Sequence, residues 1–194
     1  MDAGDTESIH NAIGQLTKDH GIQSLDVVIA NAGKGGASHK LHETPLSEMR
    51  EYMDINAYGI VELFKSSRSL LAKSAKPTFA AVTSSVGSNN RLDTTLPLAC
   101  YTTSKLVANH FVKWLAAENS KFTIFALHPG FVDTDMSQST LQEMKKVNPG
   151  IDLGLFKPIS VDESVQCLKK LIVEASHEQA HGRLMSYDGT EVPW

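Results

Sequence analysis

Three short and continuous apolar runs constrain the fold of this chain more than any other feature of its sequence. They lie at Val27–Ala30, Phe79–Val82 and Phe122–Leu127, and a weaker run lies in the segment GRLMSYDG near the end. Apolar runs without alternation are typical of strands covered on both faces, as in a parallel sheet. The sequence therefore predicts strands at these four places.

The first half of the chain also shows the spacing of amphipathic helices. The first helix should begin at Asp5 or Thr6. Its apolar face is formed by Ile9, Ala12, Ile13 and Leu16. The second should begin with Thr44 as its N-cap and Pro45 as its first helical residue. Its apolar face continues through Ile60, Leu63, Phe64, Ser67 and Leu71.

Two further helices are expected in the second half. One should run from Tyr101 to Asn119, and the other should begin at a capping box of Ser160 and Glu163. The inward-facing residues of the latter should be Val161, Val165, Leu168 and Ile172. Because helices alternate with strands, we predict one α/β domain over residues 1–194, a doubly wound parallel sheet with right-handed crossovers.

Composition limits the partners of this chain. The formal net charge is -4 and the Lys and Arg residues form no block, which argues against nucleic acid or an anionic membrane as partner. The apolar runs are too short to cross a bilayer, and the opening MDAGDTESIH is too polar for a signal peptide. The two cysteines lack zinc-type spacing. We therefore expect a cytoplasmic protein with a small-molecule partner and no metal site.

Each of the first three predicted strands runs directly into a polar motif. The motifs are NAG after Ala30, SSVGS after Thr83, and HPGFVDTDM beginning at His128. The carboxyl ends of parallel strands meet at one edge of the sheet, which is where α/β folds bind ligands. The helix that begins near Tyr101 should start at the same edge. The sequence therefore predicts that four polar segments converge there.

Tyr101 and Lys105 are four residues apart, so on a helix they share a face. A lysine cation beside a phenol favours the phenolate, and lowering a tyrosine pKa by about three units requires roughly 4 kcal/mol. A pair that exchanges protons at neutral pH is one interpretation. A solvent-exposed pair at a common spacing is the other.

The remaining polar residues at this edge also have two interpretations each. Ser84 and Ser85 form a turn or supply a hydroxyl to a substrate oxygen, and without a G-x-S-x-G elbow or a clearly placed histidine a serine hydrolase is disfavoured. The motif NAG is a tight turn or a flat surface for a ring. Asn56 bridges a backbone group and a water or caps a kink in its helix. Thr134 lies at a helix start and could bind a ligand amide.

Taken together, the motifs ANAG, DINAYG, TSSVGS, YTTSK and HPGFVDTD resemble the short-chain dehydrogenase/reductase family over essentially the whole chain. The ending GRLMSYDGTEVPW resembles its carbonyl-reductase branch, which includes fungal norsolorinic acid ketoreductase-like enzymes. This resemblance implies a Rossmann-like fold and NADP(H)- or NAD(H)-linked reduction of a small carbonyl substrate. It implies that Tyr101 is the general acid/base, that Lys105 lowers its pKa, that Ser85 polarises the carbonyl, and that Asn56 holds a relay water.

The resemblance also implies a cofactor site, a lid and an oligomer. The cofactor-binding residues would be Asp2, Asn31, Ala32, Gly33, Tyr101, Lys105, Pro129, Gly130, Val132 and Thr134. Residues 136–157, which fall largely within a long segment without periodicity, match the family's variable substrate lid. The helices around Ile60–Leu71 and Tyr101–Asn119 resemble those of the family's dimer interface, which implies a homodimer or higher oligomer.

One departure from the family pattern is large. The sequence contains no T-G-x-x-x-G-x-G turn, which places backbone N–H groups against the cofactor diphosphate. We therefore expect a partial sheet that lacks the family's first two strands and most of the third. Val27–Ala30 would then be an apolar edge, and we expect a second chain or a rearranged segment to cover it.

Three functions remain open at this stage. The first is NADP(H)-linked carbonyl reduction by a Ser-Tyr-Lys centre with an incomplete cofactor site. The second is cofactor-independent proton transfer by the same residues, as in an isomerase, dehydratase, aldol or cyclisation reaction. The third is a non-catalytic partner of full-length family members.

Overall fold

The computed structural model describes residues 1–37 and 39–194, which form a sheet of the order β1-β2-β3-β4-β5. The strands are β1 (Val27–Ala30), β2 (Thr78–Val82), β3 (Thr123–His128), β4 (Leu184–Ser186) and β5 (Glu191–Val192). Strands β1 to β4 pair in parallel, and β5 pairs antiparallel with β4. The four predicted strands and the α/β class are confirmed. The short β5 was not predicted, because two residues carry no periodicity.

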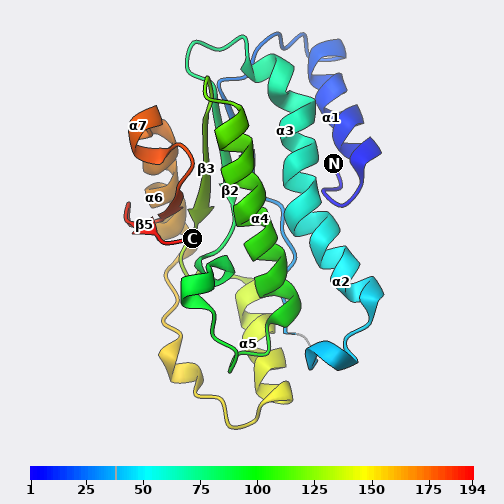
Figure 1. The fold of residues 1–194 in the computed structure, drawn as a ribbon, viewed down its shortest axis with the longest axis vertical. Helices are drawn as coiled ribbons and strands as arrows, with labels where there is room; N and C mark the ends of the chain where they lie inside the picture. Colours follow the sequence, from blue (N-terminus) through cyan, green and yellow to red (C-terminus); the bar gives the residue numbers. More distant parts are fainter. Residues whose placement is uncertain (38) are drawn as a thin grey trace.

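Helices cover the sheet from both sides (Figure 1). They are α1 (Thr6–Lys18), α2 (Leu46–Met53), α3 (Gly59–Leu71), α4 (Ala99–Glu118), α5 (Asp135–Val147), α6 (Val161–Glu174) and α7 (His177–Ala180). A π-helical turn, Asp54–Tyr58, joins α2 to α3. Helices α3 and α4 pack on one face, with α1 against α3, and α6 and α7 pack on the other. None of the helices in the described residues is long and apolar enough to span a membrane.

Aromatic residues centre the core between α3, α4 and the sheet. Phe64 of α3 lies with its ring centroid 5.1 Å from that of Phe79 and 5.8 Å from that of Phe122, both edge to face. Such edge-to-face pairs add to the stabilisation that comes from apolar burial. A smaller cluster around Phe125 and Ile172 fills the space beneath α6 and α7. These two layers fix the positions of β2 and β3, which carry the serine and histidine motifs.

Strand β1 differs from the prediction. Val28 and Ala30 are buried against α3, but Val27 is 40% exposed and Ile29 is 47% exposed. The expectation that β1 is covered on both faces is wrong for this chain, because α6 and α7 pack on β2 and β3 and do not extend to β1. No described segment rearranges to cover it. Coverage by a second chain remains a prediction.

Helix starts were predicted with mixed success. Asp5 caps α1 and Ser160 caps α6 by accepting hydrogen bonds from backbone N–H groups, as expected. Thr44 does not cap α2, because its Oγ1 donates instead to the carbonyl of Lys40 at 3.1 Å, and the helix starts one residue later than predicted, at Leu46, after Pro45.

Two further expectations about the second half are wrong. Val161 and Val165 of α6 are 47% and 55% exposed and not inward-facing. The reason is that α6 contacts the sheet chiefly through the face that carries Leu168 and Ile172, which leaves the two valines outside the contact. The segment that was expected to be irregular from residue 137 begins instead with α5, and only residues beyond Val147 lack an α-helix.

Candidate active site

The carboxyl ends of β1, β2 and β3 and the first turn of α4 lie at one edge of the sheet, towards the bottom of Figure 1. Lys105 reaches across this edge, because its Nζ donates to the carbonyl oxygen of Val82 at 3.1 Å. A Cβ atom built on Gly33 would lie 3.5 Å from the same Nζ. The predicted convergence of polar segments is confirmed.

Lys105 is 4% exposed, which excludes the interpretation as a solvent-exposed pair. Burial lowers the pKa of its ammonium group to about 8. Its Nζ lies 5.8 Å from the centroid of the Tyr101 ring, so the two side chains share a face of α4. The carbonyl oxygen of Val82 accepts a hydrogen bond from one of its three N–H groups, and within the described residues the other two are available to a ligand.

The tyrosine does not behave as expected. Burial raises the pKa of Tyr101, and a hydrogen bond with the Ser84 side chain opposes that rise only in part. The expectation of a lowered pKa is wrong for this structure, because desolvation of the buried phenolate is larger than the opposing effect of the Ser84 hydrogen bond. Tyr101 is therefore a neutral phenol at pH 7, which is the form that can donate a proton.

The serine turn packs directly against α4, the helix that carries Tyr101 and Lys105. Ser84 caps the 3-10 turn Ser85–Gly87, and its carbonyl accepts from Asn109 Nδ2 at 3.3 Å. A Cβ atom on Gly87 would lie 2.5 Å from the backbone carbon of Lys105, so only glycine allows this approach. The close contact holds the turn beside the Tyr101 and Lys105 side chains.

A histidine lies beside the predicted catalytic serine. His128 Nε2 is 3.2 Å from Ser85 Oγ. No histidine was predicted near the serines, although the strand order indicates one. In the register of β2 and β3, Val82 pairs with Leu127, and each strand then leads within three residues into Ser85 or His128.

Asn56 ties the loop after β1 to α4. It is fully buried in the π-helical turn, where its Oδ1 accepts from the backbone N–H of Lys34 at 2.7 Å. Its Nδ2 donates to the carbonyl of Lys34 and to Ser104 Oγ, both at 2.9 Å. Ser104 Oγ in turn donates to the carbonyl of Tyr101 at 2.8 Å. Asn56 thus bonds a backbone group, as one interpretation expected, and links it to Ser104; its bond to a water stays a prediction.

The motif NAG divides between two environments. Gly33 lies against Asn56 and Lys105, since a Cβ built there would be 3.4 Å from Asn56 Oδ1. Asn31 and Ala32 line a cavity of about 210 Å³ that Met1, Ala3, Ile29 and Ile60 also line. Asp2 lies between Met1 and Ala3, and its Oδ1 accepts from the backbone N–H of Gly4 at 2.9 Å.

The segment after His128 is anchored to the start of α6. Pro129 accepts at its carbonyl from Ser164 Oγ at 2.7 Å, and Val132 forms a parallel bridge with Ile159. Gly130 has φ +84°, and a Cβ there would lie 2.7 Å from Ile159 Cδ1. Thr134 caps α5, since its Oγ1 accepts from the N–H of Ser137 at 3.3 Å.

Helix α5 covers the loop that follows β1. Glu143 Oε2 accepts from the backbone N–H of Ala37 at 3.0 Å. Met136 lies against Gly35, where a Cβ atom would be 2.8 Å from its sulfur. The first part of the segment 136–157 is therefore a helix packed on the site. Whether the segment acts as a lid stays a prediction.

These features match a known family. A family model described as short chain dehydrogenase matches residues 1–145. A short chain dehydrogenase of Penicillium aethiopicum, gsfK, is 42% identical over 97% of this chain and 74% of its own length. The chain belongs to the short-chain dehydrogenase family. It is an oxidoreductase by membership of that family, and the predicted resemblance is confirmed.

Further comparisons agree with the branch and the fold of this short-chain dehydrogenase. A norsolorinic acid ketoreductase of Dothistroma septosporum is 31% identical over 95% of this chain and 68% of its own length. The NADPH-bound carbonyl reductase from chicken fatty liver has the same fold, with a TM-score of 0.84 and 23% identity, over 100% of this chain and 75% of that one.

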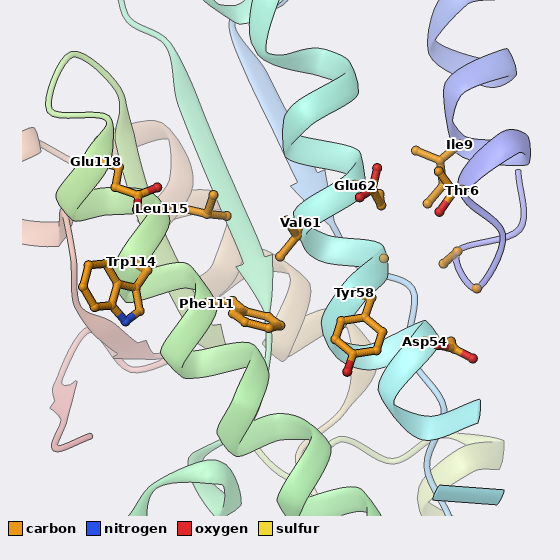
Figure 2. Close-up of a pocket in the computed structure, with 13 residues that line it drawn as sticks. Thr6, Ile9, Asp54, Tyr58, Val61, Glu62, Phe111, Trp114, Leu115 and Glu118 are labelled. Carbon is orange, nitrogen blue, oxygen red and sulfur yellow. The ribbon is translucent and has the colours of Figure 1, made fainter. Parts of the chain in front are cut away.

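A separate cavity of about 390 Å³ lies between α1, α3 and α4 (Figure 2). Its apolar lining includes Tyr58, Val61, Phe111, Trp114 and Leu115. The α4 residues that line it begin about ten positions after Tyr101, roughly 15 Å along the helix axis. We call this cavity the helix groove, and it is distinct from the site at the sheet edge.

Proposed function

We propose that this chain reduces a ketone or aldehyde with hydride from NADP(H) or NAD(H), and that Tyr101 donates the proton. The observation that carries the proposal is the buried Lys105 ammonium, which shares a helix face with a phenol that burial keeps neutral. Reduction leaves negative charge on the carbonyl oxygen, and a neutral phenol is the form that can neutralise it.

Each residue of the site has a proposed part in this reaction. Tyr101 passes its hydroxyl proton to the developing alkoxide, and the Ser85 hydroxyl donates a hydrogen bond to the same oxygen. The Lys105 ammonium offsets the tyrosinate that remains. Asn56 Oδ1 accepts one hydrogen bond from Lys34 and has a second lone pair, which would hold the water that returns a proton through Lys105.

The nicotinamide end of the cofactor fits the residues present. When bound, reduced nicotinamide supplies the hydride. The two remaining N–H groups of Lys105 would bind ribose hydroxyls, and Gly33 leaves space beside them. The cavity lined by Asn31 and Ala32 would take the adenine end, with Asp2 at its border, and residues 129–134 would flank the nicotinamide carboxamide.

The substrate and the assembly also belong to this proposal. Relatives named norsolorinic acid ketoreductase are 29% to 32% identical, which favours an aromatic polyketide ketone as substrate. We place the enzyme in the cytoplasm as a homodimer or higher oligomer. The exposed aromatic side chains of the helix groove, Tyr58 at 48% and Trp114 at 57%, support association through α3 and α4.

A second candidate is proton transfer without hydride. It is favoured by one observation: the neutral Tyr101 phenol and the buried Lys105 ammonium can move a proton without a dinucleotide, with Ser85 beside them to polarise a carbonyl. A carbonyl substrate polarised by the same three side chains could still enolise or eliminate water.

Titration with NADPH and NADH, followed by calorimetry, separates the two. Submillimolar binding together with reduction of an aromatic ketone supports the first candidate, and the tighter cofactor is then assigned. No binding, with turnover of a carbonyl substrate that Tyr101→Phe abolishes, supports the second. Neither binding nor turnover would leave a non-catalytic partner as the function of this chain.

A further inference from the structure

His128 is the last residue of β3 and lies at the centre of the site without a role in the reaction described so far. Its Nε2 is 3.2 Å from Ser85 Oγ, and no other side-chain hydrogen bond of Ser85 occurs among the described residues. Its Nδ1 is buried and has no hydrogen-bond partner in the part of the chain described. The ring is thus bound at one nitrogen only.

The unpaired Nδ1 indicates which group donates in the hydrogen bond between His128 Nε2 and Ser85 Oγ. If the proton were on Nδ1, a buried N–H donor would be orphaned, and Nε2 would accept from Ser85. If the proton is on Nε2, the orphan is an acceptor lone pair, which proteins leave unpaired more readily than a donor. The second tautomer is therefore favoured, and in it His128 donates to Ser85 Oγ.

The direction of this bond controls what Ser85 can do. A serine that donates its one hydroxyl hydrogen to histidine cannot donate a hydrogen bond to a substrate. A serine that accepts from histidine keeps that hydrogen for a third group. Because Ser85 is 8% exposed and sits on a turn held against α4 by Gly87, the hydroxyl has few other directions available.

A nucleophilic Ser–His pair is the obvious alternative, and the surroundings of the ring argue against it. A histidine that acts as base needs a group on its second nitrogen to stabilise the imidazolium, and none is present among the described residues. Burial, followed by the charge of Arg91, lowers the pKa of His128 to about 4, and Asp188 opposes this only weakly. The ring remains neutral at pH 7.

We propose that His128 is a positioning residue that donates from Nε2 to Ser85 Oγ and so aims the Ser85 hydroxyl hydrogen at the carbonyl oxygen of the substrate. The inference rests on the proposed carbonyl reduction. It deepens that proposal, because it explains how a serine with a single hydrogen remains a donor.

The catalytic test is a double-mutant cycle. We expect His128→Ala to lower kcat/KM for ketone reduction about tenfold, with NADPH binding unchanged. In a Ser85→Ala background the same substitution should change kcat/KM less than twofold, because the hydroxyl through which it acts is gone. Independent effects that multiply in the double variant overturn the inference and indicate a merely structural role.

A rescue variant and a control sharpen the cycle. His128→Gln places an amide N–H close to the position of Nε2 and should recover activity to within about threefold of the original protein. His42→Gln, at an exposed histidine in the turn Leu41–Glu43, should leave activity unchanged. A glutamine variant as slow as the alanine variant overturns the inference.

A spectroscopic test does not depend on turnover. Nitrogen-15 NMR of the histidine-labelled protein at pH 7 should show His128 protonated on Nε2, with the His128→Gln spectrum giving the assignment. Protonation on Nδ1 overturns the inference while leaving carbonyl reduction intact. If the protein reduces no carbonyl compound, the proposed function fails and the aim of the serine fails with it, whatever the tautomer.

Discussion

Proteins usually bury apolar side chains and expose polar ones, and the sheet edge and the helix groove each reverse one half of this rule. At the edge, polar groups are hidden, with Asn56 at 0% and Lys105 at 4% exposure. In the groove, aromatic groups are exposed, with Trp114 at 57% and Tyr58 at 48%. Buried polar groups cost free energy unless they are hydrogen-bonded, and exposed apolar clusters favour association. The sheet edge therefore has the character of a reaction site, and the helix groove has that of a protein–protein interface.

The hydrogen bonds support this distinction. Asn56 uses both amide hydrogens and Lys105 has a backbone acceptor, so the buried polar groups at the edge are largely paired. The groove instead presents rings beside the carboxylates of Glu62 and Glu118, as Figure 2 shows.

The largest effect is expected from Tyr101→Phe. Removing the hydroxyl deletes the proposed proton donor, so kcat/KM for ketone reduction should fall by about 10²- to 10⁴-fold. Cofactor affinity measured by calorimetry should stay within threefold, because the ring and Lys105 remain. A variant that retains full activity would remove the sheet edge as the reaction centre.

The second prediction concerns pH and Lys105. Since burial lowers the folded-state pKa of this lysine from 10.5 to about 8, the unfolded chain binds more protons between pH 8 and 10. Stability to urea should therefore rise across that window by up to about 3 kcal/mol from this group. Lys105→Met should abolish the rise.

The same titration should appear in catalysis. Above about pH 8 the ammonium is lost, and kcat/KM should decline with an apparent pKa near that value. Because burial raises the pKa of Tyr101 above its ordinary value of 10.0, ionisation of this phenol affects the rate only at higher pH. A rate that is flat from pH 7 to 10 would contradict the assignment of the charge to Lys105.

Gly87→Ala should show how tightly the serine turn is held. The added methyl would lie 2.5 Å from backbone carbon of Lys105, so we expect overpacking to cost about 1–3 kcal/mol and lower the Tm. Gly14→Ala is the matched control, because nothing lies within 4 Å of its Cβ position in α1. That variant should instead gain about 0.5–1 kcal/mol.

Substitution in the helix groove tests the contact half of the comparison. Trp114→Glu should weaken self-association at least tenfold, measured by sedimentation velocity over a range of concentrations. Leu46→Glu changes a residue that is 65% exposed in α2, outside the residues that line the groove, and should leave association unchanged. If Trp114→Glu sediments as the original protein does, the groove is not the interface.

The smallest effect is expected on the open face of β1. Ile124→Val removes a methylene from a fully buried residue and should cost about 0.5–1.5 kcal/mol. Ile29→Val makes the same change at a residue that is 47% exposed and should alter stability by less than about 0.5 kcal/mol. Equal costs for the two would mean that a second chain covers β1 in solution.

Much of the fold could be predicted from local pattern. The run Val27–Ala30 became β1 without a shift, and the spacing of Ile60, Phe64 and Leu71 identified the buried face of α3. The meeting of the polar segments at the sheet edge was also predictable, because parallel strands necessarily bring their carboxyl ends together. Both predictions depend on the spacing of apolar residues and the direction of the strands, which can be read from the sequence.

The sequence around a helix or strand does not show which element packs against each of its faces. The predictions that depended on such packing failed. Val165 has the right spacing to face inward, yet α6 packs too narrowly to bury it, and Ile29 is exposed because α6 and α7 do not extend over β1. Helix α5 was missed because its sequence, DMSQSTLQEMKKV, is largely polar, and Met144 is its one buried residue.

The order of strands and the spacing of residues along the chain were enough to predict the α/β architecture and the convergence of Ser85, Tyr101 and Lys105. The charge states and hydrogen-bond partners of these side chains depend instead on how the elements pack. Burial, which depends on every packed element, raised the pKa of Tyr101 and lowered that of Lys105. The register of β2 against β3 brought His128 to Ser85.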